Sequence, residues 1–253
     1  MATRLYCPST GSAGISPAFG SGWDVTTNAD RLNAVTTRIS SAMATKDGVG
    51  DASTAEQLLR QYISPALQAQ TISGTVKGVM RMASNSANVG MVAVAVRIAK
   101  CASDGSGVTE ILAITYSSES GSAAPPATEG TTLENRRIET GANGFTPSLT
   151  STAVDAGDRL IIEIGYKDNT TNTSRFGQIS FGDDSATDLP EDETTTTADN
   201  PWVEFSMDIA FESGGGAISG TCALVLSASA ALLGSGLLSG SAPLTFAPAA
   251  TPL

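Results

Sequence analysis

The densest set of potential metal ligands in this sequence lies in one acidic stretch. Seven carboxylates fall there: Asp183, Asp184, Asp188, Glu191, Asp192, Glu193 and Asp199. Ca²⁺ binds about six to eight oxygen atoms, which the carboxylates and carbonyls of one loop can supply. The spacing differs from that of an EF-hand. The stretch therefore predicts either a solvated acidic loop or a Ca²⁺ site formed by Asp183, Asp184 and Asp188, and no other cofactor is expected.

Glu163 is a second candidate for chemistry because it lies between Ile162 and Ile164. In an extended strand its side chain points to the opposite face from both isoleucines. It is either an outer-face residue or a carboxylic acid of raised pKa, as in a glycoside hydrolase, which needs two positioned acids. The sequence contains no His, which excludes imidazole-based catalysis and His metal ligands. We therefore predict no catalytic residues and a chain that is not an enzyme.

The few aromatic residues allow two interpretations. Trp23, Trp202, Tyr116 and Tyr166 could form a platform on which a sugar stacks, or they could fill a core or an interface. Trp202 follows Pro201 at the start of an apolar-patterned run, which favours a place in the core.

Composition excludes several partners. The chain of 253 residues has a net charge of −11, with about +4 in residues 1–100 and −15 in the remainder. Binding to nucleic acid requires a strongly basic surface, so no such partner is expected. Uninterrupted apolar runs are too short for a membrane span, which needs about 18 residues or more. The three widely spaced cysteines, at positions 7, 101 and 222, predict free thiols in a protein made in a cytoplasm.

The centre of the chain shows a repeated strand pattern. Apolar and polar residues alternate in short runs separated by Gly-, Pro- and Ser-rich turns, with no long helical pattern between them. The expected strands lie within 71–83, 91–100, 109–116, 133–138, 145–154, 159–166, 175–181 and 202–211. This pattern predicts an all-β fold, specifically an antiparallel two-sheet β-sandwich resembling a jelly roll.

The two ends of the chain differ from its centre. Residues 1–55 are rich in small residues and predict an extended N-terminal arm, in which 32–43 fits a helix and a strand equally well. Residues 56–212 form the predicted sandwich. Residues 213–253 carry no charged side chain and form a Gly-, Ser-, Ala- and Leu-rich extension with a weak internal repeat.

Both terminal segments are predicted to dock on neighbouring subunits. Residues 213–253 are too apolar to stay solvated yet too small-sided to build a core of their own, and Phe19 and Trp23 of the N-terminal segment could bury aromatic area against another surface. The expected interface residues are Phe19, Trp23, Ile218, Leu224, Leu226, Leu238, Leu244 and Phe246. A disordered C-terminal tail is the alternative for the second segment.

Several stretches carry a resemblance to a known group of proteins. They are residues 61–67, 70–78, 156–166, 181–183 and 199–205, together with Leu5, Tyr6 and Trp23. The pattern resembles uncharacterised β-rich virion structural proteins of tailed bacteriophages and prophages, of the capsid-associated or tail-fibre type. The resemblance implies a homotrimer and a location in the virion after synthesis in the host cytoplasm.

On this basis we predict a non-enzymatic virion structural protein, most specifically a capsid decoration or cement protein. Its partners would be further copies of itself and other virion proteins such as the major capsid protein. The alternative is a tail fibre or a receptor- or carbohydrate-binding module of the phage tail, with a host glycan as ligand. A glycosidase with two facing carboxylates is a third hypothesis.

Overall fold

The computed structural model describes residues 2–38, 42–50, 55–85, 92–116, 131–138, 146–168, 176–182, 187–192 and 198–212. The described residues are all-β and contain no helix. No helix able to span a membrane is therefore present among them. The chain divides into two compact units, residues 1–215 and 216–253, and the following description concerns the first.

Two large sheets account for most of the strands. Sheet A runs in the order β1 (Thr3–Tyr6), β13 (Trp202–Phe205), β6 (Val76–Ser84), β12 (Gly177–Phe181) and β3 (Ala44–Asp47), with β9 (Glu134–Arg137) also paired to β6. Sheet B runs in the order β2 (Asp30–Asn33), β4 (Glu56–Ile63), β11 (Arg159–Asp168), β7 (Val92–Cys101) and β8 (Thr109–Tyr116). A small third sheet pairs β5 (Gln70–Ile72) with β10 (Thr152–Val154).

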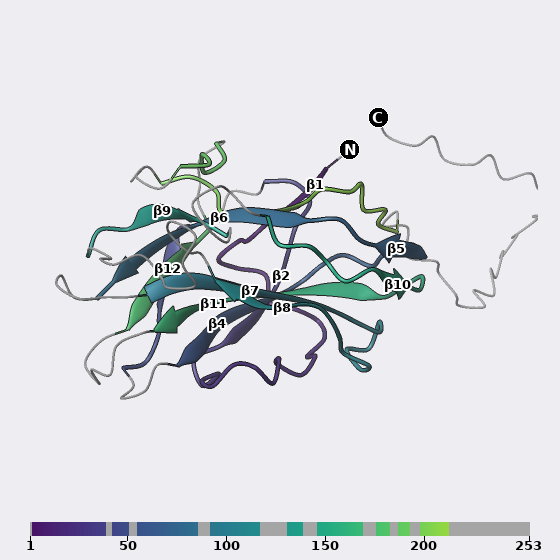
Figure 1. Ribbon diagram of the computed structural model, residues 1–253, viewed down its shortest axis with the longest axis horizontal. Helices are drawn as coiled ribbons and strands as arrows, with labels where there is room; N and C mark the ends of the chain where they lie inside the picture. The colour runs from purple at the N-terminus through teal and green to yellow at the C-terminus, as the bar shows by residue number, and fades with distance from the viewer. Residues whose placement is uncertain are drawn as a thin grey trace, which may run out of the picture. The chain divides into compact units, whose positions relative to one another are not determined.

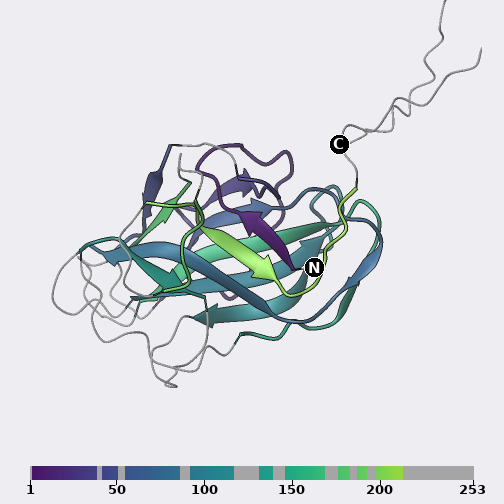
Figure 2. The ribbon, with the colours of Figure 1, turned by 90° about the horizontal axis from the view of Figure 1, so that it is seen from above.

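Almost all of these pairings are antiparallel, and the exception is β2, which runs parallel to β4. Figure 1 shows β1, β6 and β9 of sheet A above β4, β7, β8 and β11 of sheet B. In the view from above, β1 in purple lies beside β13 in yellow-green, although they come from opposite ends of the described chain (Figure 2). The sequence-based prediction of an all-β fold is confirmed.

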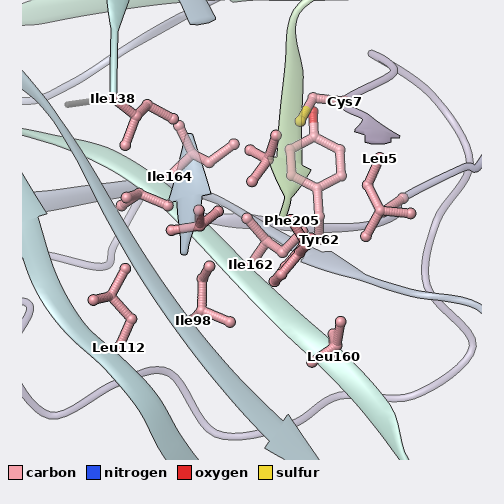
Figure 3. Close-up of a cluster of buried hydrophobic side chains, with 14 of the residues drawn as sticks. Leu5, Cys7, Tyr62, Ile98, Leu112, Ile138, Leu160, Ile162, Ile164 and Phe205 are labelled. Carbon is pink, nitrogen blue, oxygen red and sulfur yellow. The ribbon is translucent and has the colours of Figure 1, made fainter. Parts of the chain in front are cut away.

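One apolar cluster draws side chains from both large sheets. On β11 the residues Leu160, Ile162, Ile164 and Tyr166 are fully buried in it, since alternate positions of a strand share a face. Leu5 and Phe205 join the same cluster from sheet A. Figure 3 shows Leu160, Ile162 and Ile164 in one cluster with Leu5, Phe205 and Tyr62. The ring centroids of Tyr62 and Phe181 are 5.9 Å apart. The two sheets are therefore held together by a shared core.

Each strand predicted in the centre of the chain overlaps an observed strand, and 109–116 coincides with β8. The range 71–83 covers parts of two strands, β5 and β6, and the strands within 145–154 and 202–211 are the shorter β10 and β13. Four strands were missed: β1, β2, β3 and β4. The region left open between helix and strand, 32–43, begins inside β2, which ends at Asn33, and it includes Val35, which forms an isolated bridge to Tyr6. Three of the missed strands lie within residues 1–55, so this predicted arm contributes strands to both large sheets. The predicted domain boundaries themselves stay a prediction.

The first testable consequence concerns the shared core. Ile162 is fully buried on β11, so Ile162→Ala removes buried methyl groups and leaves a cavity. We expect a loss of about 2–5 kcal/mol in the free energy of unfolding. Urea denaturation followed by Trp fluorescence measures it. The exposed Ala113 on β8 of the same sheet provides the control, because Ala113→Ser should change stability by less than about 0.5 kcal/mol.

Candidate functional site

A row of polar side chains crosses all five strands of sheet B on the face opposite the shared core. It runs from Arg31 through Gln61, Glu163 and Arg97 to Glu110, one residue from each strand. Arg31 Nε donates to Gln61 Oε1 at 3.0 Å, and Arg97 Nε donates to Glu110 Oε2 at 2.7 Å. The register of the strands brings these residues together, although Arg31 and Glu163 are 132 positions apart in the sequence.

Glu163 is the centre of this row, and its side chain is fully buried. Its Oε1 accepts hydrogen bonds from the backbone N–H of Gly20 at 3.0 Å and from Gln61 Nε2 at 2.9 Å. Its Oε2 accepts from the indole N–H of Trp23 at 2.7 Å and from Arg97 Nη1 at 3.0 Å. Four donors saturate the carboxylate. This geometry makes Glu163 an anchor for the chain and leaves no lone pair for a substrate.

The residues that cover Glu163 belong to one segment, residues 13–29, which we call the covering segment. It lies close to sheet B because two glycines leave room for it. A Cβ on Gly20 would come within 2.7 Å of the Arg97 side chain. A Cβ on Gly165 would lie 1.9 Å from the Gln57 carbonyl oxygen and 2.9 Å from the indole of Trp23. Side chains at either position would push the covering segment away from the sheet.

Apolar contacts flank the buried carboxylate on both sides. Trp23 packs with Leu58 and Ala95, and Phe19 joins this cluster. The guanidinium of Arg31 stacks on the Phe19 ring at 3.8 Å from its centroid. The two N-terminal residues that we predicted at an interface therefore contact sheet B of their own chain. Whether they also contact another subunit stays a prediction.

A second polar row lies on the outer face of sheet A, and it is only partly covered. Arg4 Nη2 lies 2.7 Å from Glu204 Oε2 and Arg4 Nη1 lies 2.6 Å from Asp188 Oδ2. The Arg4 guanidinium also stacks on the buried Trp202 ring at 3.7 Å. Trp202 packs with Val79 and Leu189 on this face. The indole is thus buried, as its position after Pro201 predicted, but outside the core shared by the sheets.

Beside this row the surface has a hollow with a volume of about 60 Å³. The lining residues are Thr75, Lys77, Thr146, Glu204 and Ser206. Strand register explains the grouping, since Lys77 lies opposite Glu204 and Ser206 bonds to Thr75 through its backbone N–H at 2.9 Å. The hollow therefore combines one cation, one carboxylate and three hydroxyl side chains.

Lys77 in this hollow is held in its charged form. Its ammonium donates to Glu191 Oε1 at 2.6 Å and lies 3.4 Å from Glu204 Oε1. The hydrogen bond to Glu191 and the two carboxylate charges raise the pKa of Lys77 above its ordinary value, outweighing the opposite effect of burial. A permanently protonated Lys77 can donate hydrogen bonds to a ligand but cannot act as a general base near neutral pH.

The sequence contained part of the signal for this hollow. Glu204 and Ser206 share one face of an alternating run, and so do Thr75 and Lys77. Nothing in the sequence pairs residues 75–77 with 204–206, which are far apart along the chain. Only the pairing of β13 with β6 brings them together.

The predicted Ca²⁺ ligands are only partly described. Asp183 and Asp184 lie outside the described residues. Asp188 forms ion pairs with two arginines: its Oδ2 pairs with Arg4 Nη1, and its Oδ1 lies 3.1 Å from Arg38 Nη1. Among the residues that the structure describes, no group of three acidic or Cys side chains is placed to hold a metal ion. The metal hypothesis stays a prediction.

The predicted C-terminal interface residues also lie outside the described residues: Ile218, Leu224, Leu226, Leu238, Leu244 and Phe246.

Comparison with known proteins gives distant matches in structure only. No family model and no curated protein sequence matches the chain. The chain is similar to a CocE/NonD family hydrolase from Staphylococcus aureus, with 11% identity and a TM-score of 0.47. It is also similar to an aminopeptidase from a Thaumarchaeota archaeon, with 10% identity and a TM-score of 0.46. The matches cover 83% and 81% of this chain but 36% of each of those proteins, so it spans about a third of their length.

These matches correct the functional prediction. The sequence predicted a non-enzymatic virion structural protein, as a capsid decoration or cement protein or as a tail fibre or phage receptor-binding module. Two of the solved structures that the chain is similar to are instead a hydrolase and an aminopeptidase. The predicted function and the prediction that the chain is not an enzyme find no support in these matches, and both are withdrawn. The resemblance to phage proteins drew on strand patterns, which many unrelated β proteins share. At this level of similarity, the matches assign no activity to the chain.

The buried row on sheet B generates a second prediction. Glu163→Gln keeps the shape of the side chain but removes the negative charge beside Arg97, whose side chain is 7% exposed. We expect a loss of about 3–5 kcal/mol in the free energy of unfolding, because a buried cation loses a partner. Glu110→Gln is the matched control, since its side chain is 49% exposed and should cost less than about 1 kcal/mol. Equal effects in urea denaturation would contradict the central role of Glu163.

A third prediction concerns the two described thiols, Cys7 and Cys101, which are both buried. Burial raises the pKa of Cys101 to about 11 and raises that of Cys7 further. Both therefore stay protonated and unreactive near pH 8. In a Cys222→Ser variant we expect no reaction with Ellman's reagent in the native state and two reacting thiols in guanidinium chloride. Rapid labelling of the native variant would contradict this burial.

Proposed function

We propose that this chain is a ligand-binding β module, which holds a small group bearing a carbonyl oxygen and a hydrogen-bond donor in the hollow on sheet A. An amide is the simplest group of this kind. The observation that carries the proposal is the meeting of Lys77, Glu204 and three hydroxyl side chains around one space of about 60 Å³.

The chemistry of the lining residues defines what fits. The Lys77 ammonium is a donor suited to a carbonyl oxygen, and Glu204 Oε1 is an acceptor suited to an N–H or O–H group. Arg4 binds the other Glu204 oxygen through two nitrogens, at 3.0 and 2.7 Å, and so fixes the carboxylate in place. Positive and negative charges balance around the hollow, which favours a neutral polar group over an ion.

The finer architecture belongs to the same proposal. We infer that sheets A and B form a two-sheet β-sandwich, in which the shared core lies between the sheets and the two polar rows lie on its outer faces. A jelly-roll connectivity is the more specific form of this proposal. In either form the hollow is on the outer face of one sheet, where a ligand can reach it.

The fourth prediction is that the hollow binds a small amide. Titration of the ¹⁵N-labelled chain with N-acetylalanine amide, followed by NMR, tests it. We expect saturable shifts of the backbone N–H signals of Thr75, Lys77 and Ser206. Lys77→Met should weaken binding by about 10- to 100-fold, since a hydrogen bond to a charged group contributes about 1.5–3 kcal/mol. Lys46→Met is the control, because Lys46 pairs with Asp30 away from the lining residues.

Absence of shifts at these residues with millimolar amide would overturn the proposal. The same preparations also answer whether the hollow takes part in hydrolysis, with p-nitrophenyl acetate and alanine p-nitroanilide as substrates. Turnover that is lost in Lys77→Met and kept in Lys46→Met would place the reaction at the hollow. Turnover that survives both substitutions would place the reaction elsewhere.

A further inference from the structure

Residues 187–192, which we call the strap, lie on the outer face of sheet A. Leu189 of the strap is buried and packs on Trp202. The Leu189 carbonyl oxygen accepts a hydrogen bond from the indole N–H of Trp202 at 2.9 Å. Asn135 Nδ2 donates to the carbonyl oxygen of the next residue in the strap at 3.3 Å. The position of Glu191 is therefore fixed by contacts that the two preceding residues make.

Glu191 reaches from the strap to Lys77, which lines the hollow. Lys77 Nζ donates to Glu191 Oε1 at 2.6 Å, and this hydrogen bond is the largest cause of the raised pKa of Lys77. Glu204 Oε1 also lies near the ammonium, at 3.4 Å, but the other oxygen of Glu204 is held by two nitrogens of Arg4. Glu191 is therefore the carboxylate that neutralises the charge of Lys77, although it is not one of the lining residues.

The charges around the hollow decide which ligands can approach Lys77. A ligand carboxylate bonded to the Lys77 ammonium would lie next to Glu191 and Glu204, and like charges at such short range repel each other. A neutral amide brings a carbonyl oxygen to the same ammonium without this repulsion. Arg4 offsets the charge of Glu204, so the charge of Glu191 is the one that separates the two classes of ligand.

The Glu191 carboxylate contributes little to holding the fold together. Its side chain is 41% exposed and that of Lys77 is 30% exposed, and ion pairs this exposed add little to stability. The strap is held by Leu189 and by backbone hydrogen bonds that do not involve the carboxylate. The charge of Glu191 thus has its main effect at the hollow, and its removal leaves the fold intact.

We propose that Glu191 sets the charge specificity of the hollow, because it neutralises Lys77, admits neutral amides and excludes ligands that carry a carboxylate. This inference rests on the binding proposed above, and it adds a specificity-determining residue that does not line the hollow. It also identifies the class of ligand that one substitution would admit. In Glu191→Gln the side chain keeps its shape but loses its charge, so that Lys77 becomes available to a carboxylate.

The fifth prediction compares two ligands that differ in one group: N-acetylalanine amide, and N-acetylalanine, which is a carboxylate at neutral pH. Each is titrated into the ¹⁵N-labelled full chain at low ionic strength, and the N–H shifts of Thr75, Lys77 and Ser206 report binding. In the wild type we expect the amide to bind at least about tenfold more tightly than the acid. In Glu191→Gln the affinity for the acid should rise at least about tenfold, and added NaCl should reduce this gain.

Two further variants control for net charge and for the place of binding. Glu110→Gln removes the same charge from an exposed side chain on sheet B, away from the lining residues. It should leave the affinities for both ligands within about twofold of the wild type, because salt and water screen distant charges. Lys77→Met combined with Glu191→Gln should abolish the gain for the acid, which would place the acid at Lys77. Circular dichroism checks that each variant keeps the fold.

The outcomes separate the role of Glu191 from the proposed function. A wild type that binds the acid as tightly as the amide overturns this role and leaves amide binding in place. An equal gain in Glu110→Gln, or no gain in Glu191→Gln, also overturns it. A wild type that binds neither ligand, with binding of the acid in Glu191→Gln alone, supports the role of Glu191 and overturns the proposed function. No binding in any variant overturns both.

Discussion

The buried carboxylate of Glu163 is the constraint on which the organisation of sheet B depends. A carboxylate removed from water is costly unless donors surround it, and here they come from β4, β7 and the covering segment. Each donor is correctly placed only when the strands keep their register and when Trp23 lies on the sheet. One residue therefore ties the pairing of three strands to the path of a segment about 140 residues earlier in the chain.

The polar rows on the two sheets contain similar side chains but differ in how far other residues cover them. Both sheets carry a row in which arginine and glutamate bond across strands. On sheet B, residues 13–29 lie over the row, and the Glu163 carboxylate has no capacity left for a ligand. On sheet A, Glu204 and Lys77 remain partly exposed, with side-chain exposures of 17% and 30%, beside a hollow. Burial therefore gives the row on sheet B a structural role, whereas the partly exposed row on sheet A is where we propose that a ligand binds.

The sequence predicted strands best where the alternation was regular. The strand predicted within 159–166 was found because Leu160, Ile162 and Ile164 recur at every second position, and β11 extends it to Asp168. Strand β4 was missed because both of its faces are buried: the adjacent Leu58 and Leu59 pack in different clusters, so apolar and polar residues do not alternate along it. The N-terminal strands were missed because they are only four residues long. Such strands are defined by their partners more than by their own pattern.

The sequence by itself determined the all-β class, the absence of imidazole chemistry and the outward direction of Glu163, since composition and a two-residue period are local properties. Only the tertiary structure decided that Glu163 is buried, that Trp23 covers it, and that Lys77 and Glu204 share a hollow. These facts depend on pairing between residues far apart in the chain. Strand alternation tells which face of the sheet a side chain occupies but not what covers that face. The backbone hydrogen bonds that pair two strands are the same for nearly every residue, so the local sequence does not encode which strands become neighbours.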